Sequence, residues 1–440
     1  MNFIPFKPAQ RLLLIAAVLA VIGLLASIWP ALEVAWFAVL AVFVLISVYD
    51  LWRVRPVPPP LVQRTVATAL AVGVRHKIKL HVKNVSQRNL QIEIYDYFPE
   101  QTEIRGMPRR LHLRAGEHAE LWYFLKPLQR GIFKFDFIES QILSPFGLWR
   151  YKHLLKVEDE IRVYPNYAPV IEYALLATEN HLSMMGILKF RRRGQGMDFH
   201  QLREFRDGDS IKQIDWKASS RMRKLIAREY QDERDQQIII MLDSGHRMLA
   251  RDGELSHFDH SLNALLLLAY VALRQGDSVG VSTFSHEDRR WIKPVKGVAN
   301  INRLLNGIFD LQPGTSAPDY SSAARELVLR QRKRSLVLIL TNLRDDDYDD
   351  LRASVQMLKK HHRVVVASLQ ERAISRQLEA PVIKLNDALS VAATHAYQAR
   401  RERLVRQLRN SGIHTLDVLP EELALTLTNA YLNLKASGQI

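Results

Sequence analysis

The chain contains no cysteine, and this absence excludes several classes of protein at once. Disulfide scaffolds, thiol nucleophiles, iron–sulfur clusters and cysteine-ligated zinc sites all require that residue. Hydrophobic residues at 48% and charged residues at 24% are ordinary values for folded proteins, so a disordered, collagen-like or low-complexity chain is excluded as well. The length of 440 residues predicts two or three domains with at least one large core.

Common catalytic motifs are also absent. The sequence has no P-loop and no HExxH zinc motif. Gly194 and Gly196 have the spacing of a nucleotide-binding loop, but no strand precedes them and no third glycine follows, so we expect no dinucleotide site. Ser244 follows a strand-like run, but it is not in a GxSxG elbow and no motif supplies a histidine to activate it. We therefore expect no catalytic activity of the chain's own.

Two further patterns resemble metal sites without completing them. His257 and His260 lie three residues apart on one predicted helix, but no third ligand accompanies them, which favours a capping or surface role. The acidic run at residues 345–350 lacks the loop glycine and the terminal glutamate of a calcium-binding loop. We interpret it as a solvated acidic turn.

Residues 1–52 contain two long apolar runs and predict a transmembrane hairpin. Its helices are expected at about residues 12–29 and 31–51, each close to the roughly 20 residues that cross a hydrocarbon core. Pro30 separates the two runs. A cleavable signal peptide is the alternative, but it has a shorter apolar core followed by polar chain, whereas here a second apolar run follows directly.

Charges flanking these runs predict their orientation. Lys7 and Arg11 precede the first run and Arg53 and Arg55 follow the second, while the connection contains only Glu33. Under the positive-inside rule, both termini and the rest of the chain lie on the cytoplasmic side of the cytoplasmic (inner) membrane.

A proline-rich linker at residues 53–61 is followed by a change of pattern. Apolar and polar residues alternate in several short runs between residues 62 and 166, which is typical of antiparallel strands with one buried face. Several such strands at close spacing predict an Ig-like β-sandwich. It contains no cluster of catalytic groups, so we interpret it as a scaffold.

Residues 236–440 show continuous apolar runs at 237–243 and 335–342, alternating with helical patterns such as 258–275. Buried parallel strands alternating with helices predict a doubly wound α/β domain. Ligands of such sheets bind at the carboxyl ends of the strands, where Asp243 and Asn342 are expected. The last predicted helix, near residues 421–435, packs either on this sheet or on a neighbouring protein.

The net charge of +15 includes basic clusters at residues 191–193, 330–334 and 400–403. No aromatic residues are interleaved with them, and no nucleic-acid-binding module is recognisable. We interpret these clusters as solvated or as facing anionic lipid, and we expect no nucleic-acid partner.

The segment that connects the two domains, residues 167–235, is the most densely charged part of the chain. Opposite charges beside a tryptophan predict a buried or half-buried ion-pair network with a structural role. The residues of this signature are Gly194, Gly196, Arg203, Asp209, Asp215, Trp216, Arg221, Arg228 and Glu233.

This segment carries a family resemblance. Gly194, Gly196 and Phe199, followed by the runs LREFRDGDSIKQIDWKASSR and LIAREYQDER, resemble the bacterial domain of unknown function 58 (DUF58) family. Pieces at residues 144–148 and 163–165 agree, and the resemblance covers nearly the whole chain. It implies a von Willebrand factor A-like α/β domain and a protein partner, with a MoxR-type AAA+ ATPase as the candidate.

The resemblance also implies a metal-ion-dependent adhesion site, which the chain matches only in part. Asp243 matches the leading aspartate of Asp-x-Ser-x-Ser and Thr315 is a plausible threonine ligand, but Gly245 and Arg247 replace the two serines and Asn342 stands where an aspartate is expected. We expect no cofactor, with Mg²⁺ or Mn²⁺ as the alternative. The Arg247 guanidinium is hypothesised to pair with Asp243 in place of the ion.

Two functions follow from these observations. The first is a membrane-anchored adaptor that binds its partner at the rim of the degenerate metal site: Asp243, Ser244, Arg247, Thr315 and Asn342. The alternative is an envelope-associated enzyme or enzyme subunit that uses the carboxylates of Asp207, Asp209 and Asp215. The predicted topology disfavours the enzyme, because it places these residues away from cell-wall glycans.

Overall fold

The computed structural model describes residues 5–166, 198–206, 211, 214–231, 236–253, 255–285, 289–379 and 381–439. The chain divides into two compact units, Met1–Tyr164 and Pro165–Ile440. Each unit has its own layers and is described separately.

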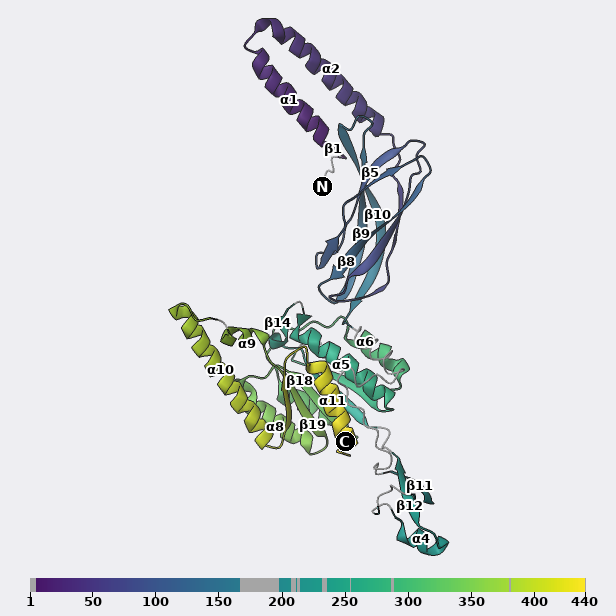
Figure 1. Cartoon of the computed structure of the whole chain (residues 1–440), viewed down its shortest axis with the longest axis vertical. Helices are drawn as coiled ribbons and strands as arrows, with labels where there is room; N and C mark the ends of the chain where they lie inside the picture. The colour runs from purple at the N-terminus through teal and green to yellow at the C-terminus, as the bar shows by residue number, and fades with distance from the viewer. Residues whose placement is uncertain are drawn as a thin grey trace. The chain divides into compact units, whose positions relative to one another are not determined.

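The first unit begins with two apolar helices, α1 (Gln10–Ala26) and α2 (Pro30–Val54), which lie side by side (Figure 1). The Trp36 indole donates a hydrogen bond of 2.9 Å to the Leu19 carbonyl, and a Cβ at Gly23 would lie 2.6 Å from the same ring. Glycine at position 23 therefore permits this close approach. Within the described residues, α2 alone is long and apolar enough to cross a membrane, over Leu32–Val54, and α1 is a shorter apolar helix.

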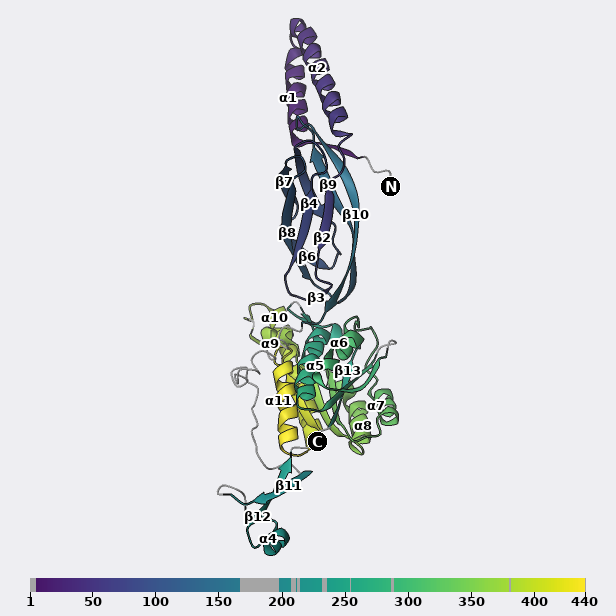
Figure 2. The ribbon, with the colours of Figure 1, turned by 90° about the vertical axis from the view of Figure 1, so that its right-hand side faces the viewer.

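The rest of the first unit consists of two β-sheets (Figure 2). One has the order β1-β10-β9-β5-β7 with β3 beside β10: β1 (Phe6–Pro8), β3 (Ala69–Ala71), β5 (Leu90–Asp96), β7 (Arg109–Leu113), β9 (Gly131–Leu143) and β10 (Trp149–Tyr164). The other has the order β2-β4-β8-β6: β2 (Leu61–Thr65), β4 (His76–Lys83), β6 (Thr102–Arg105) and β8 (His118–Pro127). All these pairings are antiparallel except the one between β3 and β10, so the expectation of antiparallel β structure is confirmed.

Period-two alternation accounts for the burial of this β-rich part. On β4, the side chains of Ile78, Leu80 and Val82 are buried, while the intervening residues point to the other face. The core also holds a buried ion pair, in which the Arg64 guanidinium lies 2.6 Å from the Asp96 carboxylate. Such a pair is stable in a dry core because both partners are further hydrogen-bonded.

A tight turn attaches α2 to the sheets of the same unit. The buried carboxylate of Asp50 accepts hydrogen bonds from the Ser144 hydroxyl and from the amides of Phe146, at 3.0 Å, and Leu148, at 3.2 Å. The Trp149 indole donates to the carbonyl and hydroxyl of Ser47. The C-terminal part of α2 is thereby fixed to the turn between β9 and β10.

The second unit has a six-stranded sheet with the order β17-β16-β13-β18-β19-β20. Its strands are β13 (Gln237–Asp243), β16 (Ser278–Phe284), β17 (Trp291–Lys296), β18 (Leu336–Thr341), β19 (Arg363–Leu369) and β20 (His414–Val418). All neighbours are parallel except β16 and β17. This mostly parallel sheet confirms the predicted α/β class of residues 236–440.

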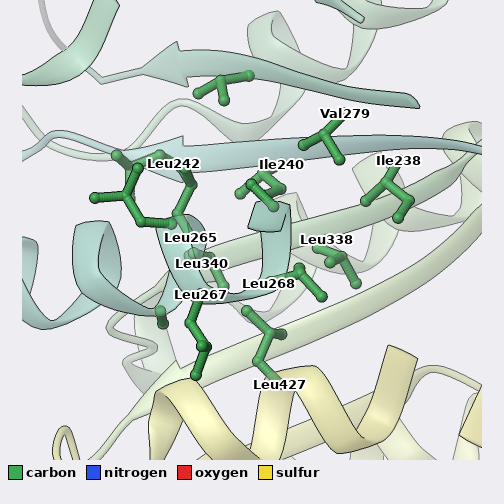
Figure 3. Packing of buried hydrophobic residues seen from close by; sticks show 14 of the residues in the cluster. Ile238, Ile240, Leu242, Leu265, Leu267, Leu268, Val279, Leu338, Leu340 and Leu427 are labelled. Carbon is green, nitrogen blue, oxygen red and sulfur yellow. The ribbon is translucent and has the colours of Figure 1, made fainter. Parts of the chain in front are cut away.

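Helices cover both faces of this sheet. They are α5 (His257–Arg274), α6 (Ile301–Ile308), α7 (Tyr320–Arg330), α8 (Tyr348–Lys359), α10 (Leu385–Asn410) and α11 (Leu423–Ala436), and the short helix α9 (Arg372–Glu379) has no buried residue. Leucines of α5 and α11 pack against β13 and β18 on one face (Figure 3). Residues of α7, α8 and α10 pack against the other face. The last helix therefore packs on its own sheet, which resolves the alternative left open by the sequence.

A small hairpin precedes this sheet in the chain: β11 (Asp198–Glu204), α4 (Trp216–Met222) and β12 (Ile226–Gln231). A two-residue pair, β14 (Arg251–Asp252) and β15 (Leu255–Ser256), leads into α5. The sequence did not indicate the edge strands β17 and β20, nor helices α7 and α9.

Candidate functional site

Asp243 lies at the carboxyl end of β13, in the middle of the sheet, and is fully buried. Its carboxylate accepts hydrogen bonds from the Gly245 amide, at 2.8 Å, and from the Thr341 hydroxyl, at 2.7 Å. The Tyr320 hydroxyl lies 2.8 Å from the Thr341 hydroxyl and completes a chain of three polar side chains. Asp243 thus joins the ends of two adjacent strands to helix α7.

Burial raises the pKa of Asp243 above its usual range, because the charged form is poorly solvated there. The hydrogen bonds from Thr341 and Gly245 offset this effect only in part. Burial also raises the pKa of Tyr320, and the nearby Asp243 adds to that effect. Both side chains are thus shielded from solvent, and their hydrogen bonds hold the ends of β13 and β18 and helix α7 together.

Arg247 does not form the hypothesised ion pair with Asp243. Among the described residues, its guanidinium forms a nearly buried ion pair with Asp347, just before α8. The same Asp347 carboxylate accepts a hydrogen bond of 3.0 Å from the Arg344 amide. The prediction was wrong because Asp347, which is also buried, lies within ion-pair distance of Arg247.

The loop after β13 and the loop around Thr315 are joined by their backbones. The Gly314 amide donates to the Ser244 carbonyl at 2.7 Å, and the His246 amide donates to the Ser316 carbonyl at 3.0 Å. Ser244 itself is buried, and its hydroxyl donates to the Phe284 carbonyl. The side chains of Thr315, Ser316 and His246 are exposed, so these loops present an accessible rim above the buried aspartate.

The residues around Asp243 do not fit the metal ion that the resemblance implies. A Cβ at Gly245 would lie 2.7 Å from the Ser316 carbonyl oxygen, so a serine ligand has no room there. The second serine position holds Arg247, which brings a cation in place of an oxygen ligand. Within the described residues, no group of three His, Asp or Glu side chains is arranged to hold a metal.

Asn342 directly follows the end of β18 and belongs to a different cluster from Asp243. It is fully buried, its amide donates to Glu371 at 3.2 Å, and its carbonyl lies 3.4 Å from the Arg401 guanidinium. Arg401, from α10, also binds Asp417 at 2.7 Å and the carbonyls of Leu343 and Leu369. Arg401 thus contacts residues at the carboxyl ends of β18, β19 and β20. Because Asn342 is bonded within this cluster, it is separate from the Asp243 rim.

The signature residues fall partly outside the described part of the chain. Gly194, Gly196, Asp207, Asp209 and Glu233 lie outside the described residues, and so does the side chain of Arg228.

The described members lie on β11 and α4, and the predicted network stays a prediction because its other members lie outside the described residues. Trp216 is 65% exposed, Arg221 is also exposed, and Arg203 is partly exposed, with its guanidinium on the Glu204 carbonyl at 3.1 Å. Asp215 caps α4 by accepting the amides of Lys217 and Ala218, both at 3.0 Å. Asp215 is therefore the N-terminal cap of α4.

Sequence reasoning missed several residues of these clusters. Thr341 reaches Asp243 from the neighbouring strand, Tyr320 reaches Thr341 from α7, and Asp347 reaches Arg247 from the start of α8. His257 is not a surface residue, since it is buried and lies 2.9 Å from Asp252. The capping box at the start of α5 uses Ser256 and Asp259 instead.

The sequence profile of the family described as "Protein of unknown function DUF58" matches residues 201–411. This region begins within β11 and extends just past the end of α10, so the similarity to this family lies in the second unit of the chain. No curated protein matches the chain.

Some solved structures resemble a quarter or less of the chain. Alpha-2-macroglobulin of Salmonella is 20% identical, with a TM-score of 0.19, over 24% of this chain and 7% of that protein. A CARDB domain from Pyrococcus furiosus is 15% identical, with a TM-score of 0.17, over 24% of this chain and 90% of the domain. A FixG-related protein from Vibrio parahaemolyticus is 15% identical, with a TM-score of 0.18, over 24% and 94%. Similarity at this level carries no argument about function, and the chain spans only a small part of the macroglobulin.

Proposed function

We propose that the chain is a membrane-anchored adaptor, whose α/β unit binds a protein partner and which has no catalytic activity of its own. The anchor is the α1–α2 hairpin, in which both helices cross the cytoplasmic membrane. The exposure of large apolar side chains along both helices supports this, for example Leu24 at 72% and Val34 at 78%. In water such a surface is unfavourable, whereas lipid solvates it.

The proposed orientation puts the β-sandwich and the α/β unit in the cytoplasm. Lys7 and Arg11 lie at the start of the hairpin and Arg53 and Arg55 at its end, while Glu33 is in the first turn of α2, beside the connection. The charge difference between the two sides is the reason for this orientation.

We further propose that the α/β unit is von Willebrand factor A-like, with a binding rim that no longer uses a metal. The observation that carries this proposal is the fixed arrangement beneath the rim. Buried Asp243 and the Arg247–Asp347 ion pair hold the loops that expose His246, Thr315 and Ser316. A rigid base with exposed polar loops suits recognition, because little conformational entropy is lost on binding.

The partner that the family resemblance suggests is a MoxR-type AAA+ ATPase. In this proposal the sandwich acts as a spacer between the membrane and the rim, and the ATPase binds at the carboxyl edge of the α/β sheet. The buried members of the predicted rim are Asp243, Ser244, Arg247 and Asn342, and in this proposal they support the loops without touching the partner.

The rim is tested with His246→Glu and Thr315→Arg in the full chain, because both side chains are exposed and their replacement leaves the buried network intact. Each is expected to reduce recovery of the partner at least about tenfold, since a charge mismatch in an interface costs several kcal/mol. The matched control is His361→Glu, an exposed histidine just before β19, at the opposite edge of the sheet. Equal recovery with His246→Glu and His361→Glu would exclude the rim as the binding surface.

A further inference from the structure

The outer face of the β2-β4-β8-β6 sheet gathers cations around two exposed aromatic rings. We call it the cationic–aromatic face. Its residues on β4, β6 and β8 are Lys77, Lys79, Lys83, Arg105, Trp122 and Phe124, and Arg109 reaches it from β7 of the other sheet. The net charge of this face is positive, since the acidic residues that accompany it on β6 and β8 are Glu103 and Glu120.

Strand register brings these residues together from distant parts of the sequence. Lys79 is paired with Trp122, and both Lys77 and Arg105 are paired with Phe124 on the two sides of β8. Side chains at paired positions of an antiparallel sheet point to the same face. The sequence did not show this surface, because the basic residues and the aromatic residues lie on different strands.

The cations interact with the rings more than with carboxylates. The Lys77 ammonium lies 4.8 Å and the Arg109 guanidinium 5.7 Å from the centre of the Trp122 ring. Of the five basic residues only Lys79 forms an ion pair, with Glu120 at 3.0 Å. Lys77, Lys83, Arg105 and Arg109 have no carboxylate within ion-pair distance among the described residues.

Trp122 is 43% exposed and Phe124 37% exposed. A cluster of like charges on an exposed apolar surface is unfavourable in the isolated molecule, because the cations repel one another and the rings contact water. An anionic ligand with an apolar side chain would relieve both costs. We propose that the cationic–aromatic face binds an extended acidic segment of a protein partner.

The position of the face within its own unit disfavours lipid headgroups as the ligand. The Arg88 guanidinium lies 3.3 Å from the Arg53 carbonyl, which places the β4–β5 loop beside the C-terminal end of α2. Lys83 is at that end of β4, and Lys77 is six residues further along the strand, about 20 Å away. This is about two Debye lengths at physiological salt, so the centre of the face lies beyond the field of a membrane in which α2 is inserted.

Single-stranded nucleic acid is disfavoured by the ring geometry. Trp122 and Phe124 pack edge to face, with centroids 5.5 Å apart and an angle of 69°, so they do not form parallel platforms for successive bases. Lys77 and Arg109 already lie against the Trp122 ring, and the Glu120 side chain is on the same face of the sheet. An acidic peptide can place carboxylates beside the free cations and one apolar side chain beside Phe124.

The proposal is tested by fluorescence anisotropy with the full chain in nanodiscs of neutral lipid. The probes are a labelled peptide of glutamate and aspartate with a central leucine, and an oligothymidylate of equal charge. Flotation with phosphatidylserine vesicles measures lipid binding. We expect the peptide to bind and the double variant Lys77→Glu/Arg105→Glu to weaken binding at least about tenfold. Trp122→Ala should weaken it as well.

The matched control is Lys134→Glu, an exposed lysine on β9 of the other sheet, where the same charge change should leave peptide binding unaltered. No peptide binding, or an equal loss in the control, would overturn the proposal. Tighter binding of the oligothymidylate would assign the face to nucleic acid, and Lys77-dependent flotation would assign it to lipid. This inference is independent of the rim, so a failure at His246 and a failure here are distinguishable.

Discussion

At the scale of single residues, the second unit depends on a carboxylate that never meets solvent. Asp243 has hydrogen bonds from both the Gly245 amide and the Thr341 hydroxyl. Without the carboxylate, the Gly245 amide is left inside the protein with no acceptor, and the Thr341 hydroxyl keeps only its hydrogen bond with Tyr320. Each such buried donor costs about 1–3 kcal/mol.

Asp243→Ala is therefore expected to lower the free energy of unfolding by about 2–4 kcal/mol. The measurement is the denaturant midpoint of the purified full chain, followed by circular dichroism. Asp346→Ala, at an exposed aspartate nearby, is the control and should change stability by less than about 0.5 kcal/mol. Equal midpoints for the two variants would show that the buried carboxylate does not stabilise the fold.

The raised pKa of Asp243 gives a second expectation with a definite sign. The folded pKa lies above the unfolded value of about 3.9, so the fold favours the protonated carboxyl. The stability from this group is present below that value and is lost as the pH rises through the folded pKa. Asp243→Asn has no such ionisation, so its stability relative to the wild type should increase over this range. Thermal melts at several pH values would measure the difference, and a constant or falling difference would contradict the assignment.

The sequence indicated the position of Asp243 but not its environment. An apolar run ending in an aspartate predicts a carboxylate at the edge of a parallel sheet. Thr341, Tyr320 and Arg401 are brought to that edge only by packing between helices and strands far apart in sequence. Arg247 was assigned to the wrong carboxylate for the same reason.

At the scale of elements, the end of α2 is held by an interaction that is unusual for a helix. An aspartate near a helix C-terminus is unfavourable, because the macrodipole is negative there. Asp50 is tolerated because the turn between β9 and β10 supplies the Ser144 hydroxyl and the amides of Phe146 and Leu148. The helix and the turn therefore stabilise each other.

In Asp50→Ala, the hydrogen-exchange rates of the Phe146 and Leu148 amides should rise about tenfold. Each amide loses a hydrogen bond worth about 1–1.5 kcal/mol. Hydrogen exchange of the full chain in nanodiscs measures this directly. Arg55→Ala, at an exposed residue just after α2, should leave both amides protected. Unchanged exchange in Asp50→Ala would mean that the turn is fixed by other contacts.

The elements that hydrophobic periodicity predicts are the ones that bury a whole face. β13, β18 and α5 were located almost to the residue because each has a long apolar pattern. β20 was missed because its five residues include only one that is fully buried, and its pairing with β19 is what makes it a strand. β17 contains Pro294, which is tolerated because β17 is an edge strand.

At the scale of the whole molecule, the absence of cysteine makes the topology easy to test. Glu33→Cys and Lys156→Cys each introduce one thiol, the first at the start of α2 and the second on an exposed part of β10. A membrane-impermeant maleimide should label position 33 in intact spheroplasts and position 156 only after lysis. The reverse pattern would contradict the proposed orientation.

The measurement that tests the adaptor function most directly is affinity capture of the full chain from its native membrane in mild detergent, with mass spectrometry of the bound proteins. We predict near-stoichiometric recovery of an AAA+ ATPase with the wild type and with His361→Glu. Recovery should be lost with His246→Glu. A chain that is recovered alone, or an ATPase that is recovered equally with all three proteins, would contradict an adaptor that acts through this rim.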